Sequence, residues 1–174
     1  MKFVFPTAEY EQAAKEFIQE FLDHGSGING TGGLDSYLRE STYTHWLAKV
    51  IRDMDIANIP EGRVPALTYF YVDDSNAIIG MINIRLALND FLRKFGGHIG
   101  YSIRPTERKK GYGTRMLREA LAFLAPIGLR DVLVTCHKEN VASAKMIQNC
   151  GGVLVDEVYS EHSGKVNQNY RIIN

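Results

Sequence analysis

The stretch that decides the fold reads Arg108-Lys109-Lys110-Gly111-Tyr112-Gly113-Thr114. The residues before it, His98 to Ile103, alternate β-branched or aromatic side chains with small ones, which predicts a strand that stops before Pro105. The residues after it place apolar side chains at i, i+3, i+4 and i+7 from Leu117 to Leu124, which predicts a helix with one buried face. The expected order is therefore strand, basic glycine loop and helix.

This order favours a binding site for a pyrophosphate at the loop. The first turn of a helix has unpaired N–H groups and the positive end of the helix dipole. Gly111 and Gly113 let a ligand approach that backbone, and the three basic residues before them add positive charge. The dinucleotide pattern G-x-G-x-x-G lacks its third glycine, and the P-loop pattern fails because the lysines precede the first glycine. An ordinary basic turn that leads into a helix stays open as the alternative.

Composition limits the remaining choices. A chain of 174 residues predicts one domain, residues 1–174, and 45% hydrophobic residues are enough for a core. The formal net charge is zero, so neither nucleic acid nor an anionic membrane is an expected partner. No signal peptide and no apolar run near ~20 residues is evident, so we expect a cytoplasmic protein. The five His and two Cys show no metal-ligand spacing, so no metal is expected.

The remaining patterns predict a mixed α/β chain of about seven strands and about four helices. The expected strands are Lys2–Phe5, Ala66–Val72, Ala77–Leu86, His98–Ile103, Val132–Cys136, Val153–Tyr159 and Val166–Ile173. A first helix buries a face from Ala14 to Phe21, and one second helix, capped at Asp35 or Ser36, buries a stripe that runs from Tyr43 to Met54. A further helix begins at Asn140 or Ser143, and Asn89 caps a short turn.

The spacing Arg-x-x-Gly-x-Gly between a strand and a helix resembles the acyl-CoA motif of the GNAT superfamily of acetyltransferases. Asn140-Val141-Ala142-Ser143 resembles the family's Asn-x-x-Ser/Ala pattern after the fifth strand, with Gly151 at the expected distance. Residues 96–105, Gly-Gly-His-Ile-Gly-Tyr-Ser-Ile-Arg-Pro, resemble uncharacterised bacterial acetyltransferases. The resemblance implies a GNAT-like fold, a largely antiparallel mixed sheet whose fourth and fifth strands splay apart to hold pantetheine.

The same resemblance implies the activity and the ligands. We expect an N-acetyltransferase that moves the acetyl group of acetyl-CoA to a primary amine of a small molecule, by direct attack in a ternary complex. A protein N-terminus or lysine as acceptor, a non-catalytic acyl-CoA-binding or sensor module, and a homodimer stay open. The acceptor side is expected to draw on the Gly25–Leu34 loop, the second helix and the final hairpin. The expected CoA-binding residues are Tyr101, Ser102, Ile103, Arg108, Lys109, Lys110, Gly111, Tyr112, Gly113, Thr114, Asn140 and Ser143.

One position departs from the family pattern. A tyrosine that protonates the leaving thiolate usually follows the Asn by seven residues, and Ile147 stands there. That role is vacant or filled by another residue. Asn140 is either a CoA contact or only a helix cap.

A base must remove a proton from the amine, and His98 is the predicted catalytic base. Strand alternation puts it on a small, polar face with Gly100 and Ser102, opposite an apolar face. The gap is expected to open near His98, at the start of its strand. The alternative is a strand-end histidine without a role. His137 and Glu139 are weaker candidates, and Cys136 is expected to be a core residue.

Overall fold

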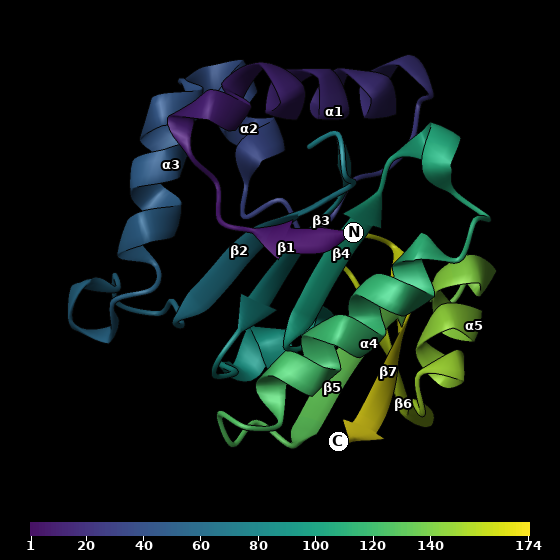
Figure 1. Ribbon diagram of the computed structural model, residues 1–174. Helices are drawn as coiled ribbons and strands as arrows, with labels where there is room; N and C mark the ends of the chain where they lie inside the picture. Colours follow the sequence, from purple (N-terminus) through teal and green to yellow (C-terminus); the bar gives the residue numbers. More distant parts are fainter.

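The computed structural model describes residues 1–174, which form one seven-stranded sheet in the order β1-β2-β3-β4-β5-β7-β6 (Figure 1). The strands are β1 (Lys2–Val4), β2 (Ala66–Val72), β3 (Ile78–Arg85), β4 (Ile99–Ile103), β5 (Asp131–His137), β6 (Val153–Ser160) and β7 (Lys165–Ile173). All neighbouring strands are antiparallel except β4 and β5. The predicted mixed, largely antiparallel sheet is therefore confirmed.

The structure contains five α-helices rather than about four. They are α1 (Glu11–Asp23), α2 (Leu34–Glu40), α3 (Tyr43–Arg52), α4 (Tyr112–Leu124) and α5 (Val141–Asn149). The expected second helix is two helices, because the Thr42 side chain accepts a hydrogen bond from the His45 N–H at 3.2 Å and starts α3 there. Met54 lies beyond the end of α3 and is 37% exposed, so it does not belong to the buried stripe. None of these helices combines the length and apolar character needed to cross a membrane.

The helices form a layer on each face of the sheet, with α1, α2 and α3 on one face and α4 and α5 on the other (Figure 1). The first face buries a core that includes Phe17, Trp46 and Phe70. The second buries a core of 15 residues that includes Leu117 and Ile147. Ile99, Tyr101 and Ile103 of β4 face this second core, as strand alternation predicts.

The neighbouring strands β4 and β5 pair at one position only, Ile99 with Val134. The pairing continues just before it, where the His98 N–H donates to the Leu133 carbonyl at 2.7 Å. Beyond Ile99 the two strands have no further register partners, so the predicted splay is confirmed. The expectation that the gap opens at the start of the fourth strand is wrong. The starts of the two strands are joined, and the gap opens at their carboxyl ends.

Candidate functional site

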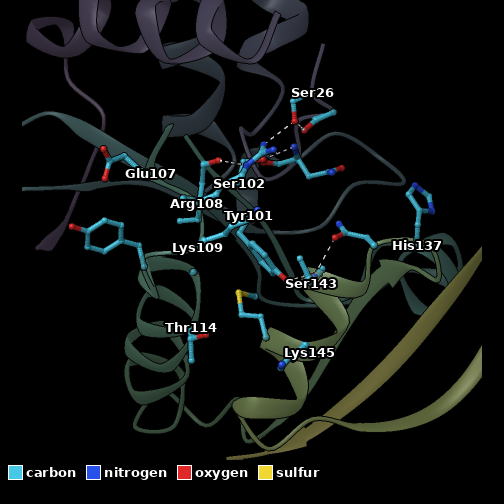
Figure 2. Close-up of a pocket in the computed structure, with 18 of the residues that line it drawn as sticks. Ser26, Tyr101, Ser102, Glu107, Arg108, Lys109, Thr114, His137, Ser143 and Lys145 are labelled. Atoms are coloured by element: carbon cyan, nitrogen blue, oxygen red, sulfur yellow. Dashed lines mark hydrogen bonds between the residues drawn. The ribbon is translucent and has the colours of Figure 1, made fainter. Parts of the chain in front are cut away.

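An open cavity of about 970 Å³ lies at the carboxyl ends of the splayed strands (Figure 2). Its walls come from the end of β4, the loop into α4, the end of β5, the start of α5 and residues 26–29. The lining residues are Ser26, Gly27, Asn29, Tyr101, Ser102, Ile103, Glu107, Arg108, Lys109, Gly111, Tyr112, Gly113, Thr114, His137, Glu139, Asn140, Ala142, Ser143, Lys145, Met146, Asn149 and Lys165. All but one of the predicted CoA-binding residues therefore meet at this cavity, the exception being Lys110.

The loop into α4 presents a row of free backbone donors to the cavity. Lys109 and Gly111 have left-handed backbone conformations, with φ of 64° and 83°. The N–H groups of Tyr112, Gly113 and Thr114 make no hydrogen bond within the chain. Such a turn at a helix N-terminus directs several N–H groups and the positive end of the dipole at one point. The backbone can therefore donate several hydrogen bonds to a single anion.

The three basic residues of the loop have different surroundings. Lys109 makes no ion pair, whereas Lys110 donates to both carboxylate oxygens of Glu107 at 2.9 Å. Arg108 turns toward the opposite wall, where its Nη2 donates to Ser26 Oγ at 2.8 Å and its guanidinium lies 5.2 Å from the centre of the Phe21 ring (Figure 2). Arg108 and Lys109 both line the cavity and make no ion pair, but the Arg108 guanidinium donates to Ser26 and to the Ile103 carbonyl, whereas the Lys109 side chain makes no hydrogen bond.

Glu20 on α1 holds the loop in place. Its Oε1 accepts from the Thr106 N–H at 2.9 Å and from the Thr106 hydroxyl at 2.8 Å. Its Oε2 lies 3.4 Å from Nε of Arg104. These contacts join the loop to α1, which lies 86 residues earlier in the chain. No local sequence signal identified this anchor, because the partners are distant in sequence.

The segment 24–33 packs against β4 and covers its small, polar face. Ser102 Oγ accepts from the Asn29 N–H at 2.7 Å and donates to the Asn29 carbonyl at 2.6 Å. A Cβ on Gly30 would lie 2.2 Å from the Gly100 carbonyl oxygen, so only glycine fits this approach. The polar face of β4 is thus occupied by this segment, which corrects the expectation that it leaves room for a substrate.

Tyr101 crosses from β4 to the first turn of α5 (Figure 2). Its hydroxyl lies 2.6 Å from the hydroxyl of Ser143. Asn140 caps α5, because its side chain accepts from the Ser143 N–H at 3.1 Å. The predicted cap is confirmed, and Asn140 also lines the cavity.

The structure does not bring His98, the predicted base, to the cavity. It precedes β4 at the joined end of the strands, is 8% exposed, and accepts from the Leu133 N–H through Nδ1 at 2.9 Å. Burial lowers the pKa of His98; Asp131 opposes this effect, while Arg93 and Arg85 reinforce it. Strand alternation identified its face, but the gap opens at the other end of the strand.

Two of the weaker candidates do reach the cavity. His137 ends β5, and its Nδ1 is buried with no hydrogen-bond partner in the chain. Glu139 is paired with Lys165 at 3.1 Å. Cys136 is buried in the core, as expected, and Ile147 is fully buried. The sequence placed His137 just after a buried strand, but it could not show that this end of the strand faces the gap.

The structure has no group of three His, Cys, Asp or Glu side chains that could hold a metal ion.

Comparison with known proteins places the chain among acetyltransferases. A family model described as an acetyltransferase (GNAT) domain matches residues 33–153. No curated protein matches the sequence.

Solved structures share the fold at low identity. The ribosomal-protein-S5-alanine acetyltransferase from Vibrio fischeri is 16% identical with a TM-score of 0.71, covering 99% of this chain and 92% of its own. Mutant forms of the spermidine/spermine N-acetyltransferase SpeG from Vibrio cholerae are 13% identical with a TM-score of 0.66, covering 99% and 92%. The microcin C7 self-immunity acetyltransferase MccE, in complex with acetyl-CoA and AMP, is 15% identical with a TM-score of 0.65, covering 99% and 91%.

Proposed function

Because the chain belongs to the GNAT acetyltransferase family, we propose that it transfers the acetyl group of acetyl-CoA to a primary amine of a small molecule. The observation that carries the proposal is the row of free N–H groups at Tyr112, Gly113 and Thr114, at the mouth of a cavity between two splayed strands. A pyrophosphate matches these donors in charge and in hydrogen-bonding capacity. MccE, a structural neighbour, is described in complex with acetyl-CoA.

Different residues of the chain would bind the pyrophosphate and the pantetheine parts of CoA. The backbone at Lys109 to Thr114 would hold the pyrophosphate, and Lys109, whose side chain makes no hydrogen bond or ion pair, would supply a cation. The backbone of Tyr101 to Ile103 would hold pantetheine, because this part of β4 has no partner on β5. Asn140 and Ser143 would line the far wall. Arg108 and Lys110 would act indirectly, since their side chains bind Ser26 and Glu107.

We assign the removal of the amine proton to His137, directly or through a water. An imidazole nitrogen can accept a proton from an attacking amine. His137 lines the cavity, and its buried Nδ1 has no hydrogen-bond partner within the chain. Strand alternation puts His137 on the face of β5 opposite Cys136, away from the α5 side. The base would therefore work from the face of the sheet opposite α4 and α5.

One observation favours a second candidate function. Ile147 is fully buried, so the usual position for a thiolate-protonating tyrosine carries no hydroxyl. This favours a non-catalytic acyl-CoA-binding or sensor module. Measurement of thiol release from acetyl-CoA across a panel of small amines, with an N-terminal peptide and a lysine peptide included, separates the two. Turnover with small amines supports the proposal, and saturable acetyl-CoA binding without turnover of any amine supports the sensor.

Binding of acetyl-CoA is tested with two matched glycines. Gly111 and Gly128 both have left-handed conformations, with φ of 83° and 89°, and a Cβ on either meets no atom within 4 Å. Gly111→Ala and Gly128→Ala therefore carry the same strain of ~1–2 kcal/mol. Calorimetry should show that Gly111→Ala alone weakens acetyl-CoA binding, because Gly128 lies beyond the other end of α4. Equal affinities in the two variants would refute the assigned pyrophosphate site.

A further inference from the structure

A leaving thiolate is stabilised when a hydroxyl donates to it, and the cavity offers six hydroxyl groups. They belong to Ser26, Tyr101, Ser102, Tyr112, Thr114 and Ser143. Ser102 is engaged with Asn29, and Ser26 accepts from Arg108. Tyr112 and Thr114 lie in the first turn of α4, at the assigned pyrophosphate position. Tyr101 and Ser143 remain, and both lie where β4 and β5 have separated.

The Tyr101 and Ser143 hydroxyls share one hydrogen bond, which leaves one of their two protons available for donation to another acceptor. They are 2.6 Å apart, and either oxygen can be the donor. Two hydroxyls carry two protons, and the bond between them uses one. No further hydrogen bond of either hydroxyl is formed within the chain; the thiols near the pair are those of Cys136 and Cys150. Burial raises the pKa of the Cys136 thiol and the Ser143 hydroxyl partly opposes the rise, so Cys136 stays protonated and is a weak acceptor.

We propose that the Tyr101–Ser143 hydroxyl pair donates a proton to the sulfur that leaves during acetyl transfer, an inference that rests on the proposed function. The amine nitrogen bonds to the thioester carbonyl carbon, and the carbon–sulfur bond breaks with its electron pair on sulfur. The pair supplies the proton that completes the thiol. The proton taken from the amine by His137 passes to solvent, and solvent restores the pair through the open cavity.

The surroundings suit the pair to this role. Burial raises the pKa of Tyr101, with the Ser143 hydrogen bond opposing it, so the phenol remains protonated over the working pH range. A donor in a partly buried site interacts more strongly with developing charge than one in water. Tyr101 is held by β4 and Ser143 by the capped first turn of α5, so neither hydroxyl has to be reoriented from a mobile loop.

The test compares CoA with desulfo-CoA, which lacks the sulfur. Calorimetry near pH 9, where a free thiol is partly ionised, measures both ligands with the wild type, Tyr101→Phe and Ser143→Ala. Tyr159→Phe, on the exposed edge strand, is the control. In Tyr101→Phe we expect about ten- to hundredfold weaker CoA binding, the worth of a hydrogen bond to a charged group. Desulfo-CoA affinity should be unchanged, which also shows that the variant is folded. Ser143→Ala should also bind CoA more weakly than the wild type does, by a smaller factor than Tyr101→Phe, with unchanged affinity for desulfo-CoA.

The outcomes separate this inference from the proposed function. A wild type that binds neither ligand defeats both. Equal affinity of the wild type and Tyr101→Phe for CoA, or an equal loss for both ligands, defeats the donor pair and leaves the cofactor site standing. Once an amine substrate is known, Tyr101→Phe should lower kcat with little change in the KM for acetyl-CoA. An unchanged kcat would overturn the assignment.

Discussion

The hydrogen bond between His98 and Leu133 joins β4 to β5 at the closed end of the gap, and its removal is a test of what His98 does. His98→Ala leaves the Leu133 N–H without its acceptor in a partly buried position. A buried unpaired donor costs about 1–3 kcal/mol. We expect urea unfolding to show a loss of this size in the free energy of unfolding. His98→Asn provides the control, because its side-chain oxygen can take the place of Nδ1 as acceptor.

Turnover measurements distinguish a structural role of His98 from its predicted role as the catalytic base. Asparagine keeps an acceptor but cannot take a proton at neutral pH. If His98 only joins the strands, His98→Asn retains both stability and turnover, whereas His137→Gln loses turnover by about 100-fold or more. Loss of turnover in folded His98→Asn, with loss of the alkaline-rising limb of the pH–rate profile, would show that His98 is the base and would refute this reasoning.

The pH dependence of stability follows from the same bond. Burial lowers the pKa of His98 in the folded state, and Nδ1 can accept from Leu133 only when the imidazole is neutral. The contribution of His98 is therefore complete above its ordinary pKa of about 6.5 and is lost as the pH falls toward its folded value. The free energy of unfolding of the wild type should fall more between about pH 8 and pH 5 than that of His98→Asn. Parallel curves would contradict the assignment.

Three further substitutions test separate parts of the structure. Thr42→Ala should lower the free energy of unfolding by about 0.5–2 kcal/mol in a denaturant titration and leave CoA affinity unchanged, because it removes only the cap of α3. Asn140→Ala should lower both stability and CoA affinity in calorimetry; full affinity would make Asn140 a cap alone. Gly30→Ala should lower the melting temperature sharply, because its Cβ would overlap the Gly100 carbonyl; a melting temperature equal to that of the wild type would be inconsistent with the close packing on β4.

Local patterns were enough to predict the loop into α4 and most of the sheet. Three sequence signals follow one another directly in the chain: the strand before Pro105, the two glycines and the apolar repeat of α4. Together they predict one strand–loop–helix unit. The division into α2 and α3 was missed, because the apolar spacing continues across Thr42 and hides its cap. The position of His98 was misjudged for a different reason. Which end of two parallel strands separates depends on their pairing, which no single strand encodes.

The contacts of the basic loop also lay beyond sequence patterns. From its sequence neighbours Lys109 and Gly111, Arg108 is predicted to bind a phosphate. In the fold it binds Ser26 and lies over Phe21, which are more than 80 residues away in the chain. His137 reaches the cavity in the same way, through a gap whose other side is a strand far from it in sequence.

The free N–H groups at the start of α4 also make the protein a reporter of its own occupancy. An amide exchanges its proton with solvent quickly when no hydrogen bond must break first, and Tyr112, Gly113 and Thr114 make none within the chain. Deuterium uptake at these three positions should therefore be fast in the free protein and slow once an anion is held there. Any compound that fills the site can be detected by that slowing, before an acceptor amine has been identified.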